Sequence, residues 1–286
     1  MKTFFADGRP EKTVTHGQAA FDLPILYFRD DAFGMYFTAD ADAVRAQMPS
    51  NRLHPVLLPS RKAIAAIFAF NYINTSIGPY GEVAVALPAV YGKPVSPSKG
   101  ILPALMESRY PGFGVVVMHL PVTRIEARDA GRGEWGYTKF IADMRFHLTP
   151  EFLHCRMWEE EEHILDLRVR RRGLCLKDNK PLTTYSVRKG DLIKTVVPQQ
   201  ATKRISLFPG GSELLLGRHP VSATIRDLDL RPLMSVYYPE RPAILPSGKI
   251  IEKGVRPMEG YRGSDRVAQH QVFYPGQVPE EQDIME

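Results

Sequence analysis

Residues 131–148 place a lysine between a glycine-rich stretch and an alternating one. The stretch reads GRGEWGYTKFIADMRFHL, and side chains on a β-strand alternate between its two faces. One face would carry Phe140, Ala142, Met144, Phe146 and Leu148, and the other Lys139, Ile141, Asp143, Arg145 and His147. The pattern predicts a strand that begins at Lys139. The amine of this lysine lies either at a solvated edge, which is the commoner case, or in a cavity.

The composition favours a β-rich fold with few helices. The chain has 286 residues, 44% of them hydrophobic, which is enough to bury a large core. Its 24 prolines and 22 glycines supply many turns, and helical periodicity is scarce. We predict an α+β class that is mainly antiparallel β, with a single domain over residues 1–250. Residues 251–286 are polar and predict an extended arm or a partly disordered tail.

Local patterns predict two helices, a hairpin and several strands. Asp40 can cap a helix over Ala41–Met48, and Pro220–Leu228 suits a second helix. Cys175–Val187, with Asp178-Asn179 as turn residues, predicts a hairpin. Further strands are predicted at Ala63–Ile73, Tyr80–Leu87, Gly114–Leu120, Ser206–Phe208, Glu213–Leu216 and Ser235–Tyr238.

Glu82 lies in a strand whose two faces carry side chains of different size. One face carries Val83, Val85 and Leu87, and the other carries Glu82, Ala84 and Ala86. A carboxylate followed by two alanines leaves room beside it. The pattern alone nevertheless favours a solvent-facing glutamate with small neighbours.

The charges do not form a nucleic-acid-binding stripe. The net charge is +5 and the isoelectric point is near 9.1, but the basic residues are dispersed. The one basic run, at residues 168–172, follows the acidic run Glu159–Glu162. Opposite blocks so close together are typical of a solvated, self-complementing surface, so we expect no nucleic-acid partner.

The cysteines and apolar runs predict a cytoplasmic protein without a membrane partner. Cys155 and Cys175 support no disulfide framework and fit a reducing compartment. The first ten residues lack the apolar region of a secretory signal. The longest apolar run, Ala63–Phe70, is too short to span a bilayer.

Residues 131–136 match the pattern GxGxxG, but their surroundings do not fit a dinucleotide site. That site needs a strand before the glycines and a helix after them, whereas a strand-like alternation follows here. The sequence contains no P-loop, GxSxG or cysteine-rich zinc pattern, and His147 with His154 is a weak pair. We therefore expect neither a cofactor nor a metal.

Amine chemistry is the remaining possibility for this stretch. A lysine forms a Schiff base only when its free amine is populated, which requires desolvation or a neighbouring positive charge. The protonated imine then acts as an electron sink for bonds next to the former carbonyl carbon. A nearby carboxylate can move protons, and an arginine can bind the acid group of the substrate.

Several segments resemble the acetoacetate decarboxylase superfamily in the same order and with similar spacing. Gly131–Ala142 is similar to the Gly-Arg-Glu…Tyr-Pro-Lys-Lys segment of that family, and Glu82 matches its active-site glutamate. Phe28-Arg29-Asp30 resembles its Asn-Arg-Glu with a one-residue gap, and Asp30 is the match without the gap. Gly217–Pro220 and Ala243–Pro246 resemble its C-terminal patterns. The resemblance covers residues 25–248.

The resemblance implies a fold, an assembly and four site residues. The fold would be a mostly antiparallel, cone-shaped β-barrel that assembles into homo-oligomers. Lys139 would form the imine, Glu82 would act as acid and base, Arg29 would bind a carboxylate and His119 would line the cavity. The chain departs from the family at Thr138, where the family has proline, and at Phe140, where it has a second lysine. Adjacent strand residues point to opposite faces, so residue 140 is poorly placed to act on Lys139, and desolvation can suffice.

The expected function is that of a Schiff-base lyase on a small oxo acid. Decarboxylation of a β-keto acid through a Lys139 imine is the first expectation. A second is an aldolase-dehydratase or related C–C lyase acting on pyruvate-type substrates, which the two departures leave open. The expectation from another class is a non-catalytic barrel that binds a small molecule.

Overall fold

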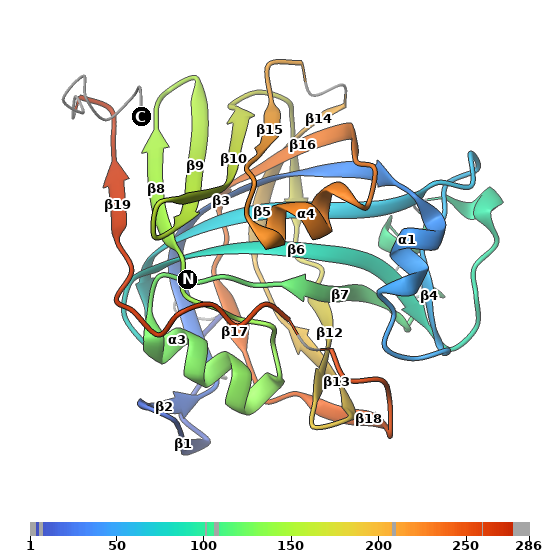
Figure 1. Cartoon of the computed structure of the whole chain (residues 1–286), viewed down its shortest axis with the longest axis horizontal. Coiled ribbons are helices and arrows are strands. Elements are labelled where there is room, and N and C mark those ends of the chain that lie inside the picture. Colours follow the sequence, from blue (N-terminus) through green and yellow to red (C-terminus); the bar gives the residue numbers. More distant parts are fainter. Residues whose placement is uncertain are drawn as a thin grey trace.

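The computed structural model describes residues 4–5, 8–100, 102–105, 109–207, 210–258 and 260–276. Two β-sheets and a small hairpin make up most of the chain (Figure 1). The hairpin pairs β1 (Lys12–His16) with β2 (Ala19–Leu23). Helical segments are short, and they are α1 (Ala41–Ala46), η1 (Pro97–Lys99), α2 (Leu102–Leu105), α3 (Ile125–Ala130), the π-helix η3 (Gly131–Trp135) and α4 (Pro220–Arg226).

In the described part of the chain, the larger sheet has twelve strands and the smaller sheet has five. The larger sheet runs in the order β11 (Leu174–Asp178), β14 (Ala201–Leu207), β16 (Arg231–Glu240), β3 (Ile25–Ala39), β5 (Ala63–Thr75), β6 (Tyr80–Tyr91), β7 (Phe113–His119), β12 (Leu182–Arg188), β13 (Asp191–Val197) and β18 (Lys249–Lys253). In addition, β17 (Ala243–Leu245) pairs with β3, and β4 (Leu53–Pro55) pairs with β6. The smaller sheet runs in the order β15 (Glu213–Leu216), β10 (Glu162–Arg170), β9 (Phe152–Glu159), β8 (Asp143–Leu148) and β19 (His270–Phe273).

The predicted class is confirmed, whereas a closed barrel is not found. Among the named strands, only β7 with β12 and β8 with β19 pair in parallel. Within the described residues, the hydrogen-bonded ladder of the larger sheet stays open between its end strands β11 and β18. The architecture is therefore mainly antiparallel β with few helices, built as two sheets rather than one closed ladder.

The larger sheet separates a hydrophobic core on one face from a cavity on the other. On β5 and β6 the buried Ala65, Ile67 and Val83 point into the core, which also contains residues of β8, β9 and β10. Their neighbours along the strands, such as Phe68 and Ala84, line the cavity instead. The alternation of a β-strand thus assigns each residue to one face.

The predicted faces around Lys139 are confirmed, but the predicted start of the strand is wrong. Phe140, Ala142, Met144, Phe146 and Leu148 all belong to the main core. The strand itself, β8, begins at Asp143, and residues 136–140 have no regular secondary structure. Val122 holds this irregular segment, because its amide donates to the Phe140 carbonyl oxygen at 2.9 Å and its carbonyl oxygen accepts from the Ala142 amide at 3.0 Å.

Both predicted helices form, but the predicted hairpin is wrong. Asp40 caps α1 by accepting hydrogen bonds from the amides of residues 42 and 43, and α4 covers most of the second predicted range. β11 pairs with β14, however, and β12 pairs with β13 and β7. The two halves of the predicted hairpin therefore pair with other strands.

The polar C-terminal segment extends over the rest of the molecule. It contributes β18 to the larger sheet and β19 to the smaller one. Between these strands, its described residues cross the surface beside α3 (Figure 1). Residues 277–286 of the predicted tail lie outside the described residues.

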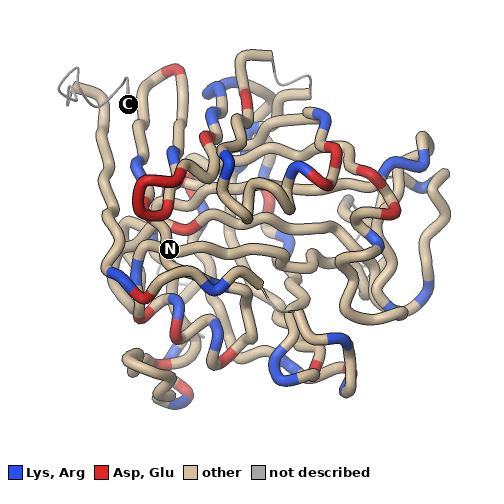
Figure 2. Tube along the Cα trace, viewed as in Figure 1, with Lys and Arg blue, Asp and Glu red and all other residues tan. Residues whose placement is uncertain are grey.

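Charged residues of both signs are interspersed along the trace (Figure 2). The acidic run Glu159–Glu162 forms the turn between β9 and β10, and the basic run lies at the opposite end of the same two strands. The two blocks therefore do not complement each other as expected, and Arg168 instead pairs with Glu213 at 3.4 Å. Cys155 and Cys175 are both free thiols. None of the helices in the described residues is long and apolar enough to cross a membrane.

Candidate active site

A short helix and two glycines position the segment that carries Lys139. α3 continues directly into η3, which ends at Gly136 with a φ of 69°, in the left-handed region that favours glycine. A Cβ at Gly136 would also collide with the Val187 carbonyl oxygen. A Cβ at Gly131 would collide with the side chain of Lys139 itself. The glycines that resemble a nucleotide motif therefore make room for the lysine and turn the chain toward it.

Lys139 and Glu82 form a buried ion pair. The Nζ atom of Lys139 donates to Oε2 of Glu82 at 2.6 Å. Lys139 is 5% exposed and Glu82 is 7% exposed, so the structure corrects the interpretation of Glu82 as a solvent-facing residue. The Tyr72 hydroxyl donates to the other oxygen, Oε1, at 3.1 Å. Lys139 and Tyr72, which are far apart in sequence, thus each hydrogen-bond one oxygen of the Glu82 carboxylate.

The pair lies in a cavity of about 170 Å³ whose walls are mostly aromatic and aliphatic. The centre of the Tyr80 ring is 5.7 Å from Nζ of Lys139. The hydroxyls of Tyr27 and Tyr80 are 3.1 Å apart. Burial raises the pKa of Tyr27, Tyr72 and Tyr80, and the charge of Glu82 adds to the rise. These phenols therefore remain protonated and can donate hydrogen bonds at neutral pH.

Tyr137 adds a further neutral hydroxyl to the same wall. Its oxygen is 2.8 Å from the Thr184 hydroxyl oxygen. Burial raises the pKa of Tyr137 to about 12. The only charged side chains among the described cavity-lining residues are Lys139, Glu82 and Arg241.

The structure does not bring Arg29 to this cavity. The pairing of β3 with β5 shifts register on both sides of Arg29. A residue of β3 between Tyr27 and Arg29 therefore has no partner, and such an extra residue reverses the face to which the following side chains point. Tyr27 consequently lines the cavity and Asp30 is buried, whereas Arg29 is exposed. The predicted placement of Arg29 is therefore corrected, and it has no contact with Lys139 or Glu82 that would support carboxylate binding in the cavity.

Arg241, which the sequence did not single out, supplies a guanidinium to the cavity. It is buried, forms an ion pair with Asp30 and lies over the Phe70 ring, 4.9 Å from its centre. Burial raises the pKa of Asp30, although Arg241 opposes the rise. Nε of Arg241 has no hydrogen-bond partner among the described residues. A charged residue between the apolar segments Ser235–Tyr238 and Ala243–Leu245 was the signal that could have identified it.

His119 is buried but lies outside the cavity that contains Lys139. The pairing of β6 with β7 shifts register between Val85 and Ala86, so His119 turns to the same side as Met118. Its Nε2 is 2.8 Å from the Thr224 hydroxyl oxygen. Burial, and then the neighbouring His219, lowers the pKa of His119 to about 4. The expectation that His119 lines the substrate cavity is therefore corrected.

The two residues that depart from the family pattern have structural contacts of their own. The Thr138 hydroxyl donates to the Met118 carbonyl oxygen at 2.8 Å. Phe140 is fully buried in the main core and packs against Tyr261, with ring centres 5.0 Å apart. Phe140 therefore points away from the cavity that Lys139 enters.

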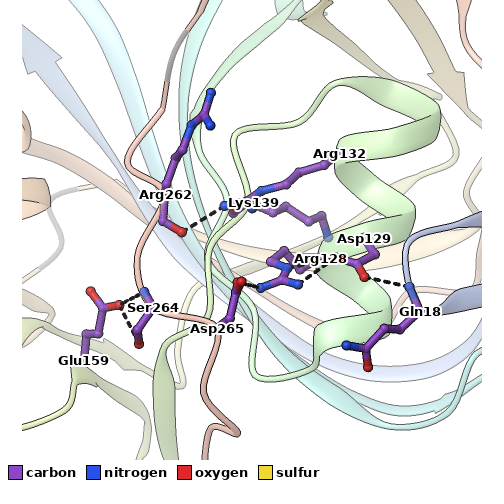
Figure 3. A network of polar contacts seen from close by, with 9 residues as sticks. All are labelled: Gln18, Arg128, Asp129, Arg132, Lys139, Glu159, Arg262, Ser264 and Asp265. Carbon is purple, nitrogen blue, oxygen red and sulfur yellow. Dashed lines mark hydrogen bonds and ion pairs between the residues drawn. The ribbon is translucent and has the colours of Figure 1, made fainter.

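A network of polar contacts fixes the helix before Lys139 to the C-terminal segment (Figure 3). Nε of Arg132 donates to the Lys139 carbonyl oxygen at 2.6 Å, and its Nη2 donates to the Arg262 carbonyl oxygen at 2.9 Å. Arg128 forms an ion pair with the carboxylate of Asp265 in the C-terminal segment. The amide of Ser264 donates to Glu159 at 2.9 Å and so extends the network to β9. The polar tail thus helps to hold the backbone of Lys139.

We expect Phe140→Ala to lower the free energy of unfolding by about 3–5 kcal/mol, because it empties a fully buried ring position. Thermal or urea denaturation measures this loss. Phe140→Leu keeps most of the volume and should cost about 1 kcal/mol. The family resemblance of the sequence implies an imine on Lys139, and reduction of that imine by borohydride should trap the substrate on the lysine equally well in the leucine variant. Loss of trapping in a folded leucine variant would contradict the assignment of Phe140 to packing.

Comparison with known proteins supports the relationship that the sequence suggested. The profile of the family described as acetoacetate decarboxylase (ADC) matches residues 11–254. A search of curated proteins gave no match. Among solved structures, an acetoacetate decarboxylase from Legionella pneumophila is similar, with 15% identity and a TM-score of 0.63 over 88% of this chain and 95% of that chain.

Two further structures share the fold at low identity. The enduracididine biosynthesis enzyme MppR, complexed with the condensation product of pyruvate and imidazole 4-carboxaldehyde, has 10% identity and a TM-score of 0.57 over 83% of this chain and 90% of that chain. An acetoacetate decarboxylase-like enzyme from Sphingomonas wittichii RW1 has 14% identity and a TM-score of 0.56 over 80% and 92%, respectively. At these identities the structures establish the fold, and the match over residues 11–254 establishes the family. The chain belongs to the acetoacetate decarboxylase family.

Proposed function

We propose that this protein is a Schiff-base lyase that decarboxylates a β-keto acid through an imine on Lys139. The observation that carries the proposal is the ion pair between Lys139 and Glu82, buried in a cavity whose other walls are largely apolar. A buried lysine amine beside a carboxylate has both the nucleophile and the proton acceptor that imine formation requires. The family relationship supports the same chemistry.

In the proposed reaction, Glu82 first accepts a proton from Lys139 across their 2.6 Å hydrogen bond. This transfer leaves a neutral amine and a neutral acid, so the net charge of the cavity does not change. The amine nitrogen attacks the ketone carbon, and Glu82 returns its proton as water leaves, which gives a protonated imine and a Glu82 carboxylate. The bond to the carboxylate carbon then breaks, carbon dioxide leaves, and the electron pair moves into the imine to form an enamine. Glu82 takes up a proton from solvent and delivers it to the enamine carbon. Water then hydrolyses the resulting protonated imine, which releases the ketone and restores the protonated lysine beside the Glu82 carboxylate.

Two other groups have defined roles in this proposal. Tyr72 donates to Glu82 at 3.1 Å and keeps its carboxylate directed toward Lys139. Arg241 replaces Arg29 as the proposed partner of the substrate carboxylate, because it lines the cavity and its Nε donor lacks a partner among the described residues. The pairing of Arg241 with Asp30 leaves this part of the cavity nearly neutral, so the carboxylate is oriented without being strongly stabilised before it leaves.

Incubation with acetoacetate and other β-keto acids tests the proposal directly. We expect release of carbon dioxide, and borohydride should trap an adduct on the peptide that contains Tyr137, Thr138 and Lys139. A condensation product from pyruvate and an aldehyde, without carbon dioxide release, would favour an aldolase-dehydratase instead. The absence of any adduct with several oxo acids and ketones would favour a non-catalytic binding protein.

Removal of the Arg241 guanidinium from the cavity should lower kcat/KM for the β-keto acid. The double variant Asp30→Asn/Arg241→Gln avoids leaving one buried charge unpaired. Relative to Asp30→Asn alone, we expect kcat/KM to fall about 10- to 100-fold, as for loss of a hydrogen bond to a charged group. Steady-state kinetics with a β-keto acid measures the change.

Arg29→Gln is the matched control, because Arg29 is an exposed arginine next to Asp30 on β3. We expect its kcat/KM to stay within about twofold of the unmodified protein, since substitutions at exposed sites change little. A large loss in Arg29→Gln, together with normal kinetics in the double variant, would return the carboxylate-binding role to Arg29.

A further inference from the structure

We infer that the substrate carries an unbranched apolar chain longer than methyl on its ketone carbon. The inference rests on the proposed function, because it assumes that the ketone carbon binds at Lys139. It concerns the shape and lining of the cavity beyond the ion pair.

The cavity continues from the ion pair along a lane of small side chains. Glu82, Ala84 and Ala86 follow one another on the cavity face of β6, and the strand rise places the last about 13 Å from the first. Their partners on β5 are Phe70, Phe68 and Ala66, respectively. The two alanines thus leave a passage beside two aromatic rings.

The passage is narrow as well as long. A cavity of about 150 Å³ with apolar walls holds a molecule the size of benzene. This cavity has a similar volume, about 170 Å³, but its lining includes Glu82, Ala84 and Ala86 along the whole lane, so we infer that its free space is elongated. On the far side of the lane, Val117 lies opposite Ala86 on β7. Such a shape suits an extended alkyl chain better than a ring or a branched group.

Apart from the ion pair and Arg241, the described lining residues of the cavity carry no charge and are mostly apolar. Leu182 is 36% exposed and lines the cavity together with Val115, Tyr36 and Tyr238. The charged lining residues, Lys139, Glu82 and Arg241, are buried. A charged group at the far end of the substrate would therefore lose its solvation without a counterion, whereas an alkyl chain would bury apolar surface.

A chain-length series with the unmodified protein tests the inference. We expect kcat/KM to rise about fourfold per added methylene from acetoacetate through 3-oxopentanoate and 3-oxohexanoate, the gain for burying one CH₂ group. The rise should level off near 3-oxooctanoate, when the end of the chain reaches the partly exposed Leu182 and buries no further apolar surface. Benzoylacetate and 3-oxoadipate, which carry a ring and a second carboxylate, should be poorer substrates than 3-oxohexanoate.

Filling the lane should weaken the preference for longer chains. In Ala84→Leu the ratio of kcat/KM for 3-oxooctanoate to that for acetoacetate should fall at least tenfold, and Ala84→Val provides a smaller block if the leucine variant does not fold. Ala20→Leu, at an exposed position on β2, is the matched control and should leave the ratio unchanged. A flat or falling series, with an adduct still trapped at Lys139, would overturn this inference and leave the proposed function intact. If no oxo acid forms an adduct, the proposed function itself fails.

Discussion

Lys139→Ala is expected to abolish both turnover and covalent trapping. The mechanism needs an amine that forms a covalent bond with the substrate, and none of the described residues lining the cavity other than Lys139 carries one. Removal of a covalent nucleophile lowers kcat by about 10⁶-fold in well-studied enzymes, so we expect a loss of that order. Carbon dioxide release measures turnover, and mass spectrometry after borohydride treatment measures the adduct.

Two further variants separate chemistry from stability. Lys139→Ala leaves Glu82 buried without its partner, which can cost several kcal/mol of stability. Lys139→Gln keeps an N–H donor near Glu82 but cannot form an imine, so it should fold and remain inactive. Lys203→Ala removes a lysine that is ion-paired with Asp178 at 2.7 Å outside the cavity, and it should trap normally. An adduct that persists in Lys139→Gln would mean that another lysine carries the chemistry.

Local patterns in the sequence predicted the faces on which Lys139 and Glu82 lie, and the family resemblance singled out the two residues. The alternation around residue 140 assigned Phe140 and Lys139 to opposite sides, and the structure confirms these sides although the strand begins later. The small neighbours of Glu82 indicated space on its face, and that face lines the cavity. Contact between the two residues depends on the pairing of distant segments, and only the family resemblance suggested it.

The residues that the sequence misplaced lie beside irregularities in strand pairing. A single extra residue in a strand reverses the face of every residue beyond it. Such a shift beside Arg29 turns it outward and buries Asp30, and a second shift turns His119 away from the cavity. Neither shift has a local signature, because each results from how a strand registers with a partner elsewhere in the chain.

Pairing between distant strands also explains the incorrect hairpin and the missed arginine. Turn residues at Asp178-Asn179 suit a hairpin, but β11 finds its partner in β14 and β12 pairs in parallel with β7. Arg241 reaches the cavity because β17 pairs with β3 and brings the preceding residues beside Asp30. A sequence pattern shows the faces of a strand but not its neighbours.

Glu82→Gln is expected to lower kcat about 10²- to 10⁴-fold, the usual contribution of a general acid–base group. Glutamine retains an oxygen that can accept from Tyr72, so the geometry of the wall should change little. It cannot take the proton from Lys139 or return one to the enamine carbon. Steady-state and single-turnover kinetics should show that both imine formation and protonation of the enamine carbon become slower.

Trapping distinguishes this proton-transfer role from a structural one. The amine of Lys139 remains in the cavity of this variant, so an imine should still form and borohydride should still label the lysine, though more slowly. Glu159→Gln is the matched control, because Glu159 is a buried glutamate that hydrogen-bonds His219 at 3.0 Å outside the cavity. Its thermal stability is the reference for that of Glu82→Gln, and its kcat should stay within a few-fold of the unmodified protein. If Glu82→Gln is folded and retains full kcat, proton transfer must pass through another group, and the tyrosine hydroxyls of the cavity would be the next to test.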